Sequence, residues 1–143
     1  MELSWLAFAL LSALAAAFVA IFAKIGLSGI DTGVATAIRA VIMALFLSGV
    51  IIAQGKLDKL PAILANNKAL TFIVLSGIAG ALSWLFYFFA LQQGKVSQVA
   101  SVDRLSVVFA TVFAALLLSE NVTPGTWAGV ALITIGAIIV AVS

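Results

Sequence analysis

Cysteine and histidine are both absent from this sequence of 143 residues, and charged residues make up only 8% of it. Without cysteine the chain can form neither disulfides nor thiolate sites. Without histidine it lacks the imidazole that most often serves as general base and metal ligand. The few basic residues are scattered singly, unlike the basic runs that bind nucleic acid. We therefore expect no enzyme, no catalytic residues, no metal, no cofactor and no nucleic-acid partner.

Hydrophobic residues make up 65% of the chain, whereas a soluble domain is about 45 to 50% apolar and about 25% charged. Seven basic and five acidic side chains cannot cover the surface of a soluble domain. The exterior must therefore face the lipid bilayer, and the sequence predicts an integral membrane protein.

The sequence divides into five apolar lengths, separated by short polar breaks that hold most of the charges. Each length matches the roughly 20 residues of helix that span about 30 Å of hydrocarbon. The predicted fold class is all-α, a polytopic membrane protein whose five transmembrane helices form one domain over residues 1–143. The expected helices cover residues 3–23, 32–53, 69–91, 96–119 and 124–142.

The lysines favour one membrane orientation only weakly. One side of the membrane holds three of them and the other side two: Lys56, Lys59 and Lys68 against Lys24 and Lys95. The positive-inside rule then places the N-terminus inside and the C-terminus outside. Arg39 and Arg104 lie nearer the lysine-poor side, so insertion in both orientations stays open.

Three ionisable residues fall inside the apolar spans: Arg39, Asp103 and Arg104. Each costs about 2.5 to 3.5 kcal/mol to insert, so such residues pair or line a wet cavity. Arg39 and Asp103 lie seven residues into helices that enter from the same side, roughly 10 Å deep at 1.5 Å per residue. Trp84 falls at the same depth on the antiparallel third helix, and Tyr87 lies one turn shallower. We expect these five residues to form one layer that binds substrate or couples transport.

Two interpretations of this layer stay open. Asp103 could simply neutralise Arg39 or Arg104 so that the helices pack, because intramembrane ion pairs can be structural. Alternatively the layer lines a cavity in which Asp103 binds a proton or cationic group, or Arg39 an anionic one.

Glu120, at the membrane edge before the last helix, is expected to have a structural role as a carboxylate near exposed amides. Thr123 and Pro124 are typical of a helix N-cap and first turn.

Four segments together resemble a known family: Phe22–Gly26, Ala35–Arg39, Trp84–Leu91 with Gly94 after it, and Glu120–Thr123 followed by Gly129 and Gly136. They are similar to the EamA domain of the drug/metabolite transporter superfamily, in its single-repeat five-helix form. Most members resemble two such repeats fused with opposite orientations around a central cavity. The resemblance implies that a second copy supplies the missing half, in a parallel or antiparallel homodimer.

The small multidrug transporters are similar in size, but they have four helices and a coupling glutamate in the first. The first helix here has no acid, which leaves Asp103 as the one deeply placed carboxylate for that role. The Asp103-Arg104 pair departs from the fused-repeat pattern, in which apolar residues or proline are common.

The leading hypothesis is a secondary transporter of a small polar metabolite or drug-like compound, in the cytoplasmic membrane of a bacterium or archaeon. The alternative is a membrane scaffold or accessory subunit that transports nothing itself. The residues do not specify the substrate, the direction of transport, the coupling ion or the helices of the dimer interface.

Overall fold

The computed structural model describes residues 2–143, and the side chains of residues 4–143. Every regular element in this part of the chain is a helix, and five spans are long and apolar enough to cross a membrane. The predicted fold class is therefore confirmed, and the chain is an integral membrane protein. The spans are α1 (Glu2–Gly26), α2 (Thr32–Ala53), α4 (Asn67–Gln93), α5 (Val96–Asp103) with α6 (Ser106–Leu117), and α7 (Pro124–Val142).

Side chains cap the starts of three long helices, and at α4 the Asn66 amide oxygen accepts a hydrogen bond from the Ala69 amide (3.0 Å). The Asp31 carboxylate accepts a hydrogen bond from the Val34 amide (2.8 Å) and begins α2. Thr123 Oγ1 accepts from the Thr126 amide (3.2 Å), and Pro124 occupies the first turn of α7, so the predicted cap is confirmed. Each cap satisfies an amide that has no partner within its helix.

The fourth span is not the continuous helix over residues 96–119 that the sequence predicts. It is interrupted between α5 and α6, and α6 ends at Leu117. At the interruption the Arg104 amide donates to the Ser101 carbonyl (3.2 Å) and the Leu105 amide to the Val102 carbonyl (2.9 Å). These bonds span three residues, as in a 3₁₀ turn, and tighten the backbone. The helix stops short of residue 119 because Ser119 has a left-handed φ of 53°.

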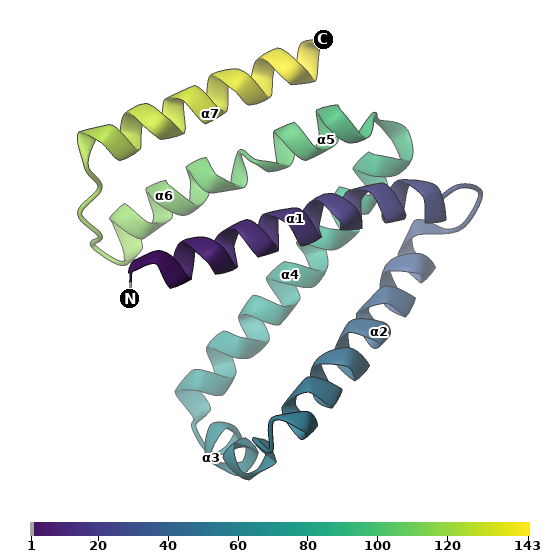
Figure 1. Cartoon of the computed structure of the whole chain (residues 1–143), viewed down its shortest axis with the longest axis vertical. Helices are drawn as coiled ribbons and strands as arrows, with labels where there is room; N and C mark the ends of the chain where they lie inside the picture. Colours follow the sequence, from purple (N-terminus) through teal and green to yellow (C-terminus); the bar gives the residue numbers. More distant parts are fainter. Residues whose placement is uncertain (1) are drawn as a thin grey trace. The chain divides into compact units, whose positions relative to one another are not determined.

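The chain divides into two compact units, residues 2–26 with 90–143 and residues 27–89. In the first unit α7 packs along α5 and also contacts α6, while α1 contacts α5 (Figure 1). Its most buried apolar residues include small ones, such as Ala20 and Ala137, which let helices approach closely in a membrane. That the two units act as one domain stays a prediction.

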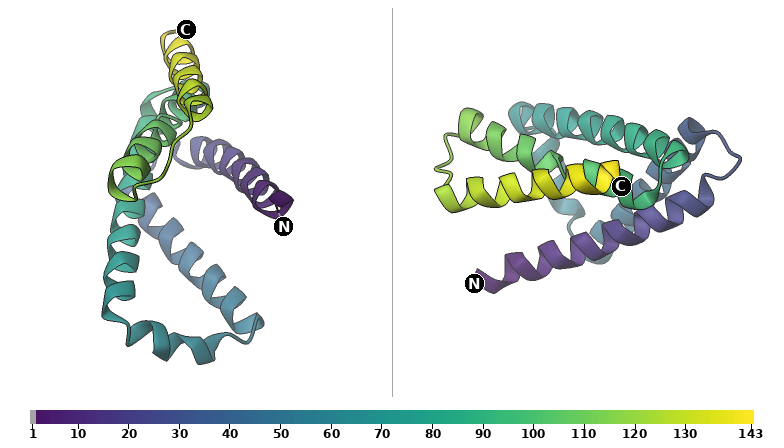
Figure 2. Two further views of the ribbon diagram at one scale, coloured as in Figure 1. Left: turned by 90° about the vertical axis from the view of Figure 1, so that its left-hand side faces the viewer. Right: turned by 90° about the horizontal axis from the view of Figure 1, so that it is seen from above.

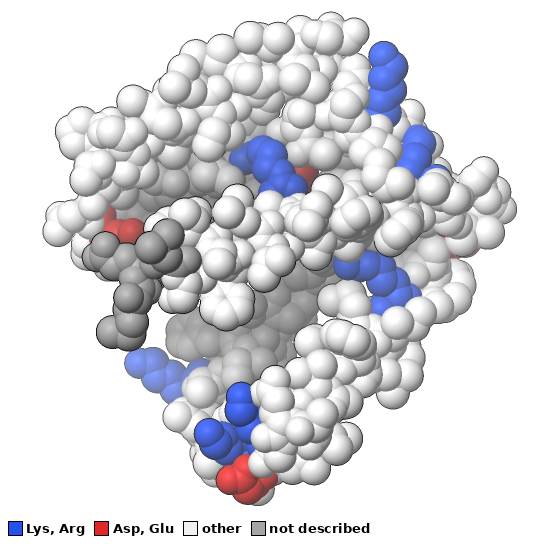
Figure 3. Space-filling model, viewed as in Figure 1, with Lys and Arg blue, Asp and Glu red and all other residues white. Residues whose placement is uncertain are grey.

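In the second unit α2 and α4 are joined by a polar connection made of η1 (Leu57–Lys59) and α3 (Leu60–Leu64). The two long helices diverge toward this connection (Figure 2). Lys56, Asp58 and Lys59 are exposed there, and charged side chains gather at this end of the unit (Figure 3). Apart from Arg39 within α2 and Asp31 at its start, the charges of this unit lie near the polar connection, and the spans expose large apolar side chains such as Phe46 and Phe72.

Candidate functional site

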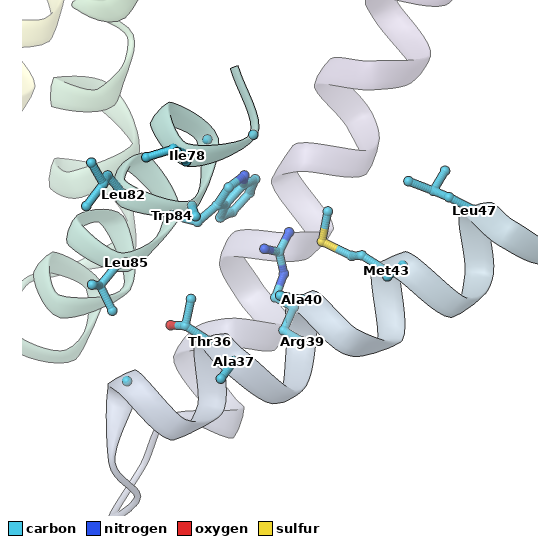
Figure 4. Close-up of a pocket in the computed structure, with 15 residues that line it drawn as sticks. Thr36, Ala37, Arg39, Ala40, Met43, Leu47, Ile78, Leu82, Trp84 and Leu85 are labelled. Carbon is cyan, nitrogen blue, oxygen red and sulfur yellow. The ribbon is translucent and has the colours of Figure 1, made fainter. Parts of the chain in front are cut away.

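Arg39 and Trp84 face each other across the second unit. The Arg39 side chain extends from α2 toward α4, and its guanidinium carbon lies 3.8 Å from the centroid of the Trp84 ring (Figure 4). The same carbon lies 5.2 Å from the Phe88 ring. A cation over an aromatic face gains about 0.5 kcal/mol when exposed and about 2 kcal/mol when desolvated. The half-buried Arg39 is therefore held in place by aromatic rings.

The Trp84 ring is itself fixed by neighbouring aromatic rings on α4. Tyr87 and Phe88 both meet it edge to face, each with ring centroids 5.6 Å apart. Phe88 is only 3% exposed and was not among the predicted site residues. Its i, i+4 spacing from Trp84 places both on one face of α4, and this is the signal by which it could have been found.

A cavity of about 690 Å³ lies between α2 and α4, and Arg39, Met43 and Trp84 are among its lining residues. We call it the α2–α4 groove. Its wall on α4 includes Gly77 and Gly80. A Cβ placed on either glycine would meet nothing within 4 Å. Gly77 and Gly80 therefore leave space in the groove.

The groove contains one charged residue. Arg39 is the only Lys, Arg, Asp or Glu among its lining residues, and within the described part of its unit the guanidinium makes no hydrogen bond or ion pair. The Thr36 hydroxyl donates to the Thr32 carbonyl at 2.7 Å, so its proton is already engaged. Among its own lining residues the groove is thus an apolar cleft with one positive charge and no negative one.

Asp103 and Arg104 lie at the interruption between α5 and α6, in the other unit. Asp103 is half-buried and Arg104 is exposed. Within the described part of its own unit Asp103 makes no salt bridge. The structure thus brings together Arg39, Trp84 and Tyr87, while the single layer of all five residues stays a prediction.

Glu120 lies exposed in the connection between α6 and α7. The helix-capping contact that could have been its role is made by Thr123, so the structural role of Glu120 stays a prediction. Among residues 4–143 there is no group of three His, Cys, Asp or Glu side chains that could hold a metal ion.

Lys24 makes a second polar cluster that the sequence did not indicate. Its ammonium donates to the main-chain carbonyls of Leu91 (2.6 Å) and Gly94 (2.8 Å), where α4 ends. Lys24 lies in the last turn of α1, which continues to Gly26 and so beyond the predicted end at residue 23. Since helix C-termini carry partial negative charge, a cation there is stabilising. We call this cluster the Lys24 clamp.

Residues 3–142 match the EamA-like transporter family. The chain belongs to this family. An uncharacterized transporter in the cobO 3' region of Sinorhizobium sp. is 40% identical over 142 residues, which cover 99% of each chain. The uncharacterized protein MJ1333.1 of Methanocaldococcus jannaschii is 28% identical over 81 residues, 57% of this chain and 59% of that protein. No solved structure matches.

For this EamA-like chain the family resemblance of the sequence is confirmed over nearly its whole length. Family membership and the transporter-named relative, together with the five spans, support a membrane transporter.

Proposed function

We propose that this chain is a secondary transporter of a small polar metabolite or drug-like compound, rather than an enzyme. The observation that carries the proposal is the α2–α4 groove, in which Arg39 lies 3.8 Å from the Trp84 ring centroid and no carboxylate is among the lining residues. Its volume of about 690 Å³ lies in the range of about 300 to 1,000 Å³ usual for ligand sites. An ionisable residue within a membrane span is also costly to insert, so its presence there indicates a functional role.

The proposal includes a dimer in which each copy supplies one five-helix repeat. Transporters built from inverted repeats bind substrate at the repeat interface and alternate access by rocking one repeat against the other. An antiparallel pair of identical chains would reproduce that arrangement, and the nearly even division of lysines permits it. In this scheme Asp103 is the carboxylate that couples transport to a proton.

Uptake into liposomes tests the transport proposal directly. Purified chain would be reconstituted, and a panel of labelled acids, amines, zwitterions and neutral compounds would be offered with and without a proton gradient. We expect gradient-dependent uptake of at least one class. A folded, self-associated protein that transports none of them would overturn the proposal, and a stable complex with an unrelated membrane protein would favour the scaffold alternative.

Membrane orientation is tested separately by labelling. The chain has no cysteine, so single cysteines can be introduced in the polar connection at η1 and in the turn after α4. Membrane-impermeant maleimide applied from one side should label each position in a fraction of the molecules if both orientations occur. Labelling of only one of the two positions would establish a single orientation and exclude the antiparallel pair.

A further inference from the structure

We propose that the substrate is a small organic monoanion, a carboxylate on an apolar body, and that the α2–α4 groove binds it with Arg39 as the anion-recognising residue. This inference rests on the proposed transport function, because it names the class of compound that the same groove takes.

The charge of the groove favours a negatively charged ligand. The second unit contains two carboxylates, and neither lines the groove. Asp31 caps α2 through the Val34 amide, and Asp58 lies in η1 at the polar connection. An uncompensated arginine in hydrocarbon costs several kcal/mol, so an anion that enters the groove removes that cost as it binds.

The geometry of Arg39 leaves its donors available for such an anion. The guanidinium is planar, and all five of its N–H groups point outward within the plane. The Trp84 ring centroid lies 3.8 Å from the guanidinium carbon, and the N–H edge makes no hydrogen bond within the described part of the unit. The edge matches the two oxygens of a carboxylate in a bidentate pair, while the ring contacts hold the guanidinium before the ligand arrives.

The walls of the groove select the rest of the ligand. Among the lining residues only Thr36, Arg39 and Trp84 carry a side-chain nitrogen or oxygen, and Ile78 and Leu82 are typical of the others. Nothing in the walls could neutralise an ammonium group, so amines and amino acids would bury a charge without a partner. The space beside Gly77 and Gly80 suits an apolar or aromatic body.

Binding of radiolabelled benzoate tests this inference with the full chain in nanodiscs of zwitterionic phosphatidylcholine, corrected for empty nanodiscs. We expect saturable binding that unlabelled benzoate displaces, whereas benzyl alcohol and benzylamine displace it at least tenfold less well. This series uses the unmodified protein, so it stands even if a variant fails to fold. Displacement by benzylamine as strong as that by benzoate would overturn the inference.

Variants then assign the binding to Arg39. We expect R39Q to weaken benzoate binding at least tenfold and R39K to weaken it less, because an ammonium keeps the charge but loses the bidentate fit. The matched control is K59Q, which removes an exposed basic side chain of the same unit outside the groove and should leave binding unchanged. Equal binding by folded R39Q and the wild type would overturn the assignment.

Two further outcomes separate this inference from its competitors. If anionic phosphatidylglycerol in the nanodisc displaces benzoate through Arg39, the groove holds a lipid headgroup and the inference is wrong. If D103N increases benzoate affinity tenfold, Asp103 is already the counter-ion of Arg39 and the inference is wrong. Benzoate binding without uptake would leave this site standing while the transport proposal fails. Uptake of other classes of compound without benzoate binding would support the transport proposal and overturn the inference of a carboxylate site.

Discussion

Replacing Lys24 with methionine should destabilise the first unit by about 3 kcal/mol. The ammonium makes two hydrogen bonds, of 2.6 Å to the Leu91 carbonyl and 2.8 Å to the Gly94 carbonyl. Hydrogen bonds to a charged group contribute about 1.5 to 3 kcal/mol each, and we take the lower value because Lys24 is only half-buried. Leu91 is fully buried at 0% exposure, so water cannot easily replace the lost donor there.

The measurement is the free energy of unfolding in mixed detergent micelles, followed by circular dichroism as denaturing detergent is added. K24M should unfold at a lower denaturant fraction than the wild type, and K24R should recover part of the difference because it keeps the charge and the donors. The matched control is K95M, which removes the same charge beside Gly94 from an exposed side chain. The Lys95 side chain makes no hydrogen bond to another described side chain. K95M should therefore lower the free energy of unfolding by less than about 0.5 kcal/mol.

Equal destabilisation by K24M and K95M would refute this reasoning, because the loss would then come from the net charge and not from the clamp. An effect of K24M below about 0.5 kcal/mol would also refute it, since two bonds to main-chain carbonyls would then contribute nothing measurable.

Three further predictions follow from single contacts. G94A should destabilise the protein by about 1 to 3 kcal/mol, because its Cβ would lie 2.9 Å from Val99 Cγ2. Adding V99A to G94A should restore part of that loss in the same detergent titration. The control is G26A, whose Cβ would meet nothing within 4 Å. D103N should abolish proton-driven uptake while gel filtration shows unchanged folding and assembly; normal uptake would contradict the coupling role, and loss of folding would make Asp103 structural. T123A should cost about 1 kcal/mol through loss of the α7 cap, T123S much less, and equal stability of the two variants would contradict the capping role.

The five spans were predictable because length and hydropathy alone define a segment that must lie in lipid. The interruption between α5 and α6 was not. No glycine or proline occurs at residues 103–106, and the bend depends on the Arg104 amide bonding to Ser101. Whether an amide bonds to the carbonyl three or four residues before it does not depend on the hydrophobic pattern, so that pattern cannot predict the interruption.

The candidate site was predictable where it depends on depth. A fixed helical rise places residues of antiparallel helices at a common level, and Arg39 and Trp84 indeed meet. The Lys24 clamp was not predictable, because its acceptors are main-chain carbonyls, the nearer one 67 residues away. Every residue carries a main-chain carbonyl, so the residue types in the sequence do not identify the carbonyl to which a lysine donates.

The stacking of Arg39 on Trp84 also gives the groove an optical reporter. The chain has only three tryptophans, and the other two, Trp5 and Trp127, belong to the first unit. Replacing that pair with phenylalanine would leave Trp84 as the sole strong emitter, with a guanidinium against its indole ring. Any ligand that draws the guanidinium aside would change the emission, so occupancy could be followed in real time without attaching a dye.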